Sequence, residues 1–176
     1  PEYSRKGDRI IFSSQRSGWE ELWLAQNNGQ DVGPVTRFQG THCGDVSWSP
    51  DDKRVAFHSC VEGSGDIYVK DAKVCLSEGP SCEIEPCCLR RITFSEYDDF
   101  SPSWSNDGNW IYFASYQSGH VELWKKELEG GDPVQVTQGG GTYAVEDAED
   151  GLLYFSKWDQ PGIWRMPIEG GPEEQV

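Results

Sequence analysis

Apolar and aromatic side chains alternate with polar ones in short runs along the chain, and stretches rich in Asp, Gly and Ser interrupt the runs. A period of two residues is typical of a half-buried β-strand, and the interruptions mark tight turns. The 3.6-residue period of an amphipathic helix is missing, so we expect no substantial helix. The pattern therefore predicts an all-β protein of many short strands.

One stretch of sequence recurs along the chain. Residues 47–59 read SWSPDDKRVAFHS and residues 103–115 read SWSNDGNWIYFAS, and fainter copies occupy residues 3–14 and 147–157. Each copy predicts a strand, a turn containing Asp or Gly, and a second strand, after which a third and a fourth strand follow. The copies are anchored by four phenylalanines, Phe12, Phe57, Phe113 and Phe155.

Repeats of this length, each a four-stranded antiparallel sheet, are typical of β-propeller blades, which pack face to face around an axis. We therefore expect an all-β propeller with four blades in this chain. Aromatic residues make up 12% of the sequence and include eight Trp. Such side chains fill the space between blades, where we expect Trp104. The four blades are expected to span about residues 1–38, 39–94, 95–138 and 139–176.

The chain begins inside a first strand and ends near the close of a fourth strand, which leaves no spare strand to close a ring. Three arrangements follow: a compact four-bladed ring, a segment of a larger ring, or a half-ring completed by a second copy or by another chain. In the last two, we expect the fourth blade to present an uncovered face carrying Tyr154, Phe155 and Trp164. An exposed apolar face of this kind favours association.

A longer motif surrounds the best copy of the repeat. Residues 101–108 read SPSWSNDG and residues 110–115 read WIYFAS, and ELW, GG and VT follow at residues 122–124, 130–131 and 136–137. This combination resembles the TolB-like propeller repeat, and the resemblance covers essentially the whole chain. The fourth copy departs from it, because Asp147 stands where the repeat has Trp.

The resemblance implies the propeller fold but several different roles. Similar repeats occur in the bacterial periplasmic protein TolB, in sensor regions of membrane-anchored transcriptional regulators, and in the propellers of dipeptidyl-peptidase and tricorn-type proteases. Fold alone does not select one of these functions.

The charge of the chain excludes some classes of partner. Fifteen Lys and Arg residues against thirty Asp and Glu residues give a formal net charge of -15. Such a field repels phosphate backbones and anionic lipid headgroups, so we expect neither nucleic-acid binding nor membrane contact. No apolar run approaches the length of a membrane span, and no signal-peptide pattern precedes the first strand.

Six cysteines indicate disulfides and hence a periplasmic or extracellular location. Cys43 precedes the first strand of the second blade and Cys60 follows its second strand, so regular pairing predicts them as cross-strand neighbours that could form a disulfide. Cys75, Cys82, Cys87 and Cys88 lie in an enlarged connection in the same blade.

Those four cysteines leave several alternatives open. Bonding adjacent Cys87 and Cys88 would strain the backbone, which leaves Cys75 paired with either of them and Cys82 with the other. A zinc site is the rival interpretation, although the spacing lacks the Cys-x2-Cys knuckle of such sites. Free thiols are the third.

Motifs for catalysis are missing from the sequence. It contains no Gly-x-Ser-x-Gly elbow, no His-Glu-x-x-His and no phosphate-binding glycine loop before a helix. His58 lies within a strand and is expected to be half-buried and structural. We therefore expect a non-catalytic protein that needs no cofactor.

Two sets of residues are candidates for binding. Carboxylates near the starts of first strands could converge on the central channel and hold calcium or a basic peptide, although solvated acidic loops are the simpler interpretation. These are Asp45, Asp98, Asp99 and Glu146. The second set lies on the upper face, which we define as the loops joining second to third strands and the linkers joining consecutive blades. Its members are Trp19, His42, Tyr116, His120 and Trp158.

Aromatic residues that do not repeat in register suggest contact with a partner, and packing against the adjacent blade is the alternative. We therefore predict a non-catalytic scaffold that binds a protein or peptide through the upper face and the channel. A gating propeller of a serine peptidase and a ligand-sensing propeller of a transcriptional regulator are the alternatives.

Overall fold

A computed structural model describes residues 1–38, 43–74 and 89–176. Sixteen strands in these residues form four antiparallel sheets, each with its strands in chain order. The first two sheets consist of β1 (Glu2–Tyr3), β2 (Arg9–Ser14), β3 (Glu21–Gln26), β4 (Gly33–Pro34), β5 (Cys43–Trp48), β6 (Arg54–Ser59), β7 (Asp66–Asp71) and β8 (Leu89–Arg91). The other two consist of β9 (Asp99–Trp104), β10 (Trp110–Ser115), β11 (Glu122–Glu127), β12 (Val134–Gln135), β13 (Ala144–Glu146), β14 (Leu152–Ser156), β15 (Ile163–Pro167) and β16 (Glu174–Gln175).

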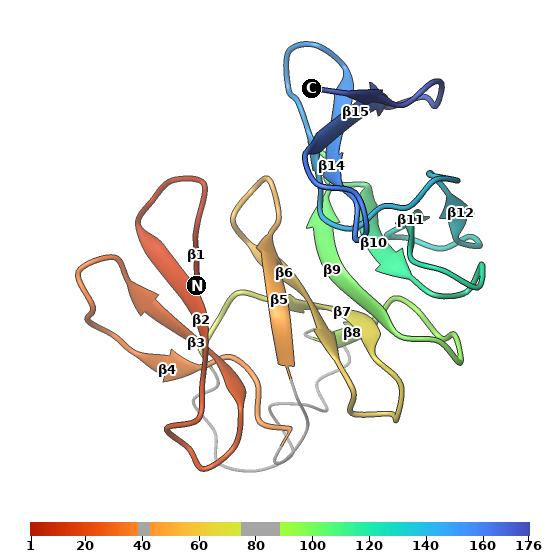
Figure 1. The fold of residues 1–176 in the computed structure, drawn as a ribbon. Helices are drawn as coiled ribbons and strands as arrows, with labels where there is room; N and C mark the ends of the chain where they lie inside the picture. The colour runs from red at the N-terminus through yellow and green to blue at the C-terminus, as the bar shows by residue number, and fades with distance from the viewer. Residues whose placement is uncertain (39–42, 75–88) are drawn as a thin grey trace.

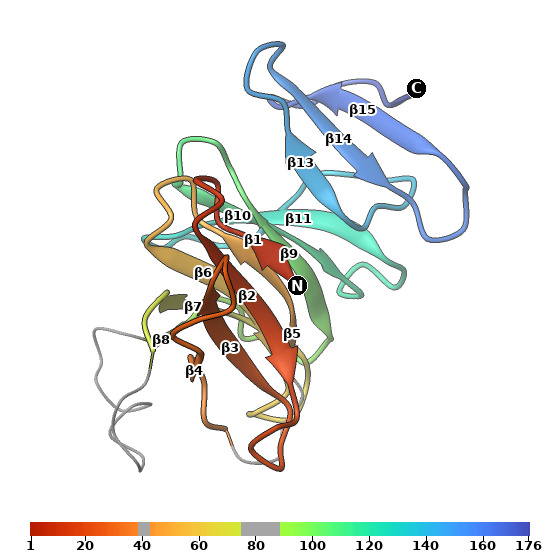
Figure 2. The same cartoon turned by 90° about the vertical axis from the view of Figure 1, so that its left-hand side faces the viewer.

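Each sheet is one blade, so the structure confirms the predicted all-β propeller architecture. The first strands of consecutive blades, β1, β5, β9 and β13, lie next to one another. Figures 1 and 2 show the blades in an open arc, with the fourth blade apart from the first. The compact closed ring of four blades is therefore wrong. The described residues contain no helix, and so none that is long and apolar enough to cross a membrane.

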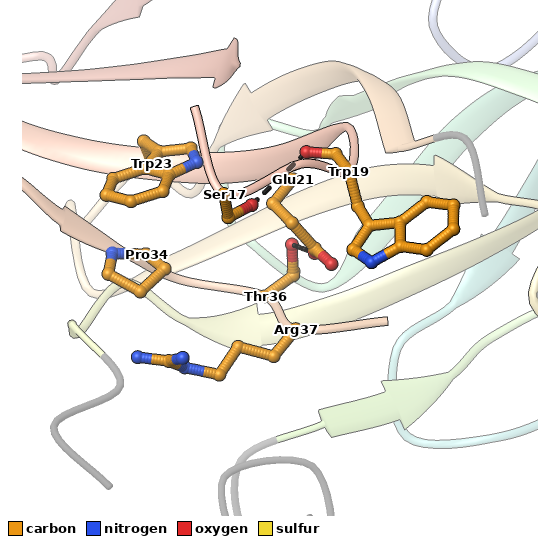
Figure 3. Close-up of a pocket in the computed structure, with 7 residues that line it drawn as sticks. All are labelled: Ser17, Trp19, Glu21, Trp23, Pro34, Thr36 and Arg37. Carbon is orange, nitrogen blue, oxygen red and sulfur yellow. Dashed lines mark hydrogen bonds between the residues drawn. The ribbon is translucent and has the colours of Figure 1, made fainter. Parts of the chain in front are cut away.

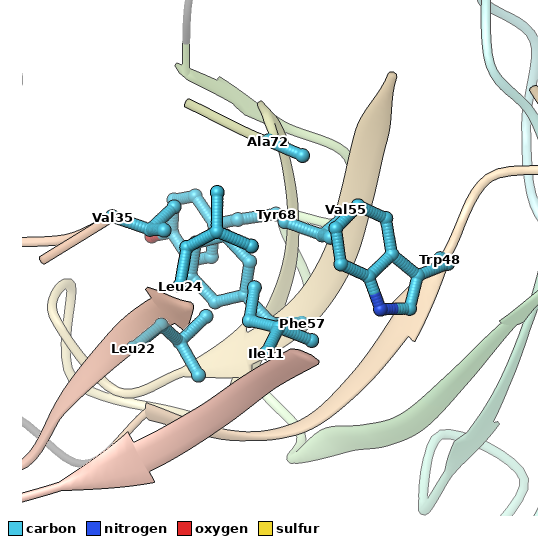
Figure 4. Close-up of a cluster of buried hydrophobic side chains, with 9 residues drawn as sticks. All are labelled: Ile11, Leu22, Leu24, Val35, Trp48, Val55, Phe57, Tyr68 and Ala72. Carbon is cyan, nitrogen blue, oxygen red and sulfur yellow. The ribbon is translucent and has the colours of Figure 1, made fainter. Parts of the chain in front are cut away.

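Blades pack through alternate residues of their strands. In the second blade, Phe57 and Tyr68 stack with ring centroids 5.9 Å apart. They lie in one buried cluster with side chains of the first blade (Figure 4). The first-blade members are Ile11, Leu22, Leu24 and Val35. The face that carries the anchoring Phe therefore points toward the preceding blade.

The same rule corrects the expected face of the fourth blade. Phe155 is buried in a cluster with Tyr112 and Leu123 of the third blade, and Trp164 packs against that cluster. Successive side chains of a strand point to opposite faces of its sheet, so Tyr154 and Phe155 cannot share one. The uncovered face of the fourth blade carries Tyr154 and Ile163 instead.

Indole hydrogen bonds join the inner strands of the first three blades. Trp48 Nε1 donates to the carbonyl oxygen of Glu2 at 3.2 Å, and Trp104 Nε1 donates to that of Ser47 at 3.2 Å. Trp104 is buried, and the guanidinium of Arg54 lies 5.1 Å from the centre of its ring. The predicted position of Trp104 between blades is thus confirmed.

In the fourth blade the position of this Trp is occupied by Glu146, which pairs with Leu153 as Trp104 pairs with Ile111. The expectation that Asp147 replaces the Trp is therefore wrong by one residue, and the carboxylate of Glu146 replaces the indole. Glu146 accepts hydrogen bonds from the backbone N–H of Asn106 and from the hydroxyl of Tyr112, both at 2.7 Å. Asp147 itself caps its own turn by accepting from the N–H groups of Glu149 and Asp150, each at 2.8 Å. The fourth blade is therefore fastened to the third by charge-assisted bonds.

Bulges interrupt two of the inner strands. The pairing register shifts within β5 and within β9, where Asp45 (φ 44°) and Ser101 (φ 51°) adopt left-handed conformations. Because of the first bulge, the backbone of Cys43 pairs with Ser59 and not opposite Cys60. The expected cross-strand pairing of Cys43 with Cys60 is therefore wrong: the extra residue moves the register by one position. Cys60 is a free thiol.

Candidate functional site

Large aromatic side chains project from the upper face at separate blades. Trp19 lies in the β2–β3 loop, Tyr116 in the β10–β11 loop and Trp158 in the β14–β15 loop. All three are exposed, and Trp158 retains 74% of its accessible surface. His120 is also exposed, and its Nε2 lies 3.0 Å from Oε1 of the buried Glu122. His42 lies outside the described residues.

A pocket of about 350 Å³ opens beside Trp19 (Figure 3). Figure 3 shows Glu21 and Thr36 between Trp19 on one side and Trp23 on the other. Thr36 Oγ1 donates to Glu21 Oε2 at 2.6 Å, and this bond fixes the carboxylate at the rim. The pocket is lined by Ser17, Trp19, Glu21, Trp23, Pro34, Thr36 and Arg37. It lies on the face of the first blade that, in later blades, is covered by the preceding blade.

The pair Glu21 and Thr36 belongs to a network that recurs in the next two blades. In the second blade, Thr93 Oγ1 lies 3.3 Å from Asp66 Oδ1; in the third, Thr137 Oγ1 lies 2.5 Å from Glu122 Oε2. In each blade the Thr hydroxyl also accepts a backbone N–H at 2.9 Å. These buried acids therefore close the upper end of each blade.

The predicted channel carboxylates do not converge. Asp98 is exposed on the upper face, where Oδ1 accepts the N–H of Gly65 at 2.8 Å, and Asp99 beside it is buried. Asp45 lies at the bulge of β5, and Glu146 lies at the far end of β13 beside Asn106. A strand rises about 3.3 Å per residue, so carboxylates at its start, middle and end cannot meet at one ion. Within residues 1–38, 43–74 and 89–176, no three His, Cys, Asp or Glu side chains form a metal-binding group.

A second pocket, of about 420 Å³, lies between the inner strands. Asp45, Glu2 and Tyr143 line it together with Pro1, Ser13, Leu22, Gly44 and Val46. Burial raises the pKa of Glu2 to about 7, and the backbone of Trp48 opposes this only partly. Asp45 also accepts the hydroxyl of Ser101 at 3.2 Å, and His58 Nδ1 lies 3.6 Å from the same carboxylate.

Two exposed aromatic residues between the second and third blades were not selected by the sequence interpretation. Phe94 and Tyr97 lie in the linker between β8 and β9, at the upper face. Phe94 directly follows the Ile-Thr pair that closes the second blade, where the first and third blades have Arg37 and Gln138. That departure from the repeat was the available signal.

The cysteines predicted to form disulfides or a zinc site are only partly visible. Cys75, Cys82, Cys87 and Cys88 lie outside the described residues. Their pairing therefore stays a prediction.

Comparison with known proteins identifies the family. The profile of the TolB beta propeller domain matches residues 1–174, which is nearly the whole chain. The chain belongs to the TolB β-propeller family. Tol-Pal system protein TolB of Desulfosudis oleivorans is 32% identical over 77 residues, which cover 44% of this chain and 15% of that protein.

Solved structures agree with the TolB fold. TolB from Acinetobacter baumannii superposes with a TM-score of 0.75 at 16% identity, over 98% of this chain and 41% of that one. A puromycin-hydrolyzing peptidase of Mycobacterium tuberculosis superposes with a TM-score of 0.67 at 15% identity, over 99% of this chain and 28% of that one. At these identities the likeness shows the fold alone. The chain spans less than half the length of each of these TolB relatives.

Proposed function

We propose that this TolB-family propeller segment is a binding scaffold, without a reaction of its own, for a protein or peptide partner. The partner would lie across the upper face and reach the mouth of the second pocket, the one between the inner strands. A bacterial periplasmic location fits this role, and both the similarity to TolB and the six cysteines support it.

The observation that carries the proposal is the exposure of Trp19, Tyr116 and Trp158 at one end of three blades. The aromatic residues of the repeat itself, such as Phe57 and Phe113, are fully buried. Large aromatic side chains that remain in solvent are costly unless a partner covers them, and they dominate the energetics of protein interfaces.

Selection from a library of random linear peptides tests the proposal. The immobilised chain is compared with a variant carrying Trp19→Ser, Tyr116→Ser and Trp158→Ser. We expect selected peptides to bind the triple variant about tenfold more weakly or worse, because interface aromatics carry much of the binding energy. A matched control carries Val32→Ser and Val134→Ser. These replace two exposed apolar residues at the opposite face: Val32 lies in the β3–β4 connection, and Val134 directly follows the β11–β12 connection.

Binding that survives the triple variant but is lost in the Val32→Ser, Val134→Ser control would place the partner on the opposite face. A library that yields no peptide specific for the folded chain would count against binding through Trp19, Tyr116 and Trp158.

A further inference from the structure

Four aromatic residues lie at the upper ends of the second and third blades. Phe94 and Tyr97 lie in the β8–β9 linker and are 68% and 49% exposed, and Tyr116 in the β10–β11 loop is 41% exposed. Phe100 lies beneath, with its ring centroid 6.0 Å from that of Tyr116. We call these four residues the boundary patch.

Hydrogen bonds hold the linker of the boundary patch in its exposed position. Gly65 N–H donates to Asp98 Oδ1 at 2.8 Å, and Asp99 N–H donates back to the carbonyl of Gly65 at 2.7 Å. Ser64 Oγ donates to the carbonyl of Ser95 at 3.2 Å. The linker is thus fastened to the β6–β7 loop, so its aromatic rings are presented without prior rearrangement, which lowers the entropic cost of binding.

The surroundings of the patch are negatively charged. Glu62, Glu96 and Asp98 are exposed there, and Asp66 and Asp99 are buried beneath them. The pKa of the Cys60 thiol is raised by burial and by the carboxylates of Asp98 and Asp66. Burial, with Asp66 adding to it, also raises the pKa of Asp99.

Arg91 shows what the patch accepts. Its guanidinium lies 4.8 Å from the centre of the Phe94 ring, and its Nη2 donates to Asp66 Oδ2 at 2.7 Å. Its Nε donates to the carbonyl of Thr93 at 2.9 Å. The chain therefore already pairs the Arg91 cation with the Phe94 ring and the Asp66 carboxylate. Phe94 is 68% exposed, so its ring is accessible to a second cation.

We propose that the boundary patch binds a cationic segment of a partner protein, whose Arg or Lys side chains stack on Phe94, Tyr97 and Tyr116. The carboxylates of Glu96 and Asp98 pair with the same cations. This inference rests on the proposed binding function and assigns it a place and a partner chemistry. Complementarity with the negative surroundings favours this occupant over an acidic or purely apolar segment.

Nuclear magnetic resonance titration with defined peptides tests the proposal. The probe is a blocked peptide of alternating glycine and arginine, and its match is the same peptide with neutral citrulline in place of arginine. We expect the arginine peptide to shift backbone resonances of residues 94–98 and 116 saturably, and the citrulline peptide to bind more weakly. Higher salt should weaken the arginine peptide, because exposed charges are screened.

Two substitutions distinguish the contribution of the Phe94 ring to peptide binding from that of the Glu96 charge. Phe94→Ala should weaken binding of the arginine peptide about two- to fivefold, as expected for an exposed cation–π contact, and Phe94→Tyr should restore it. Glu96→Gln should weaken binding about twofold. Tyr3→Ala and Glu149→Gln, which change exposed residues of the first and fourth blades, are the controls and should leave the affinity unchanged.

Equal binding of the citrulline peptide, or resonance shifts that map elsewhere, would overturn the proposal. Insensitivity to both Phe94→Ala and Glu96→Gln would also overturn it, even if peptides from the random library still required Trp19 and Trp158. In that case the proposed binding function would be supported and only the proposal for the boundary patch would be rejected. If the library yields no ligand while the arginine peptide binds at residues 94–98, the proposal for the boundary patch would be supported. The proposed binding through Trp19 and Trp158 would then be rejected.

Discussion

The indole nitrogen of Trp104 donates a hydrogen bond to the carbonyl oxygen of Ser47, 3.2 Å away, and so ties the inner strand of the third blade to that of the second. The same indole is buried between the two blades, and the guanidinium of Arg54 lies over its ring. One side chain therefore supplies both apolar burial and a directional bond at the joint between blades.

Trp104→Ala should lower the free energy of unfolding by about 3 to 5 kcal/mol, because it opens a cavity between two blades. Trp158→Ala should change it by less than about 0.5 kcal/mol, since Trp158 lies in solvent. Urea denaturation followed by circular dichroism measures both. Equal losses in the two variants would contradict the assignment of Trp104 to the joint.

The joint between the third and fourth blades should depend on Glu146. Glu146→Ala leaves the Tyr112 hydroxyl and the Asn106 N–H without their acceptor and should cost about 1.5 to 3 kcal/mol. A double-mutant cycle with Tyr112→Phe isolates the hydroxyl contact. Strictly additive losses would show that the two side chains do not interact in solution.

Replacing the network threonines should destabilise single blades. Thr137→Val removes the donor to Glu122 and the acceptor of the Leu123 N–H and should cost about 1 to 3 kcal/mol. Thr137→Ser keeps the hydroxyl and is the matched control. Hydrogen exchange should accelerate first at β11 and β12; uniform acceleration over all four blades would argue against a local role.

Glu2 should make stability fall as the pH rises from about 4.5 to about 7. The folded carboxyl has a pKa near 7 against 4.5 in the unfolded chain, so the folded state binds the extra proton in this window. Deprotonation then costs on the order of 1 to 2 kcal/mol after allowance for the partial exposure of Glu2. Glu2→Gln should flatten this part of the pH profile, and an unchanged slope would contradict the burial of the carboxyl.

Alkylation of the native protein reports on the cysteines. Cys60 should react, but slowly, because its thiol is free yet half-buried and its pKa is raised by burial and by Asp98 and Asp66. If the four cysteines of the 75–88 connection form two bridges, the intact mass before alkylation should fall about 4 Da below the fully reduced mass. Six reactive thiols in native material would remove the argument for an oxidising compartment.

The sequence repeat was sufficient to predict most of the fold. Phe57 and Phe113 recur with their Trp and Tyr partners at fixed offsets, and those offsets predicted blades, buried anchors and the place of Trp104. The errors came from counting along strands. A bulge at Asp45 moved Cys43 by one position, and the adjacent residues Tyr154 and Phe155 were assigned to one face although neighbours in a strand point to opposite faces.

The candidate site was predicted less completely. The exposure of Trp19, Tyr116 and Trp158 followed from their place in loops, outside the repeat. Glu146 was misplaced because the fourth copy of the repeat was aligned one residue out: Glu146 itself takes the position of the Trp, which lies at the far end of the strand. Phe94 and Tyr97 were missed because a linker has no period, and its exposure depends on bonds to the β6–β7 loop that no local pattern encodes.

The bulge at Asp45 divides an inner strand into two halves that can vary independently. Below it, Ser47 and Trp48 keep the alternation that the joints between blades require; above it, the pairing of β5 with β6 is moved by one residue. The added residue thus separates the register of the upper half from the register on which the joints depend.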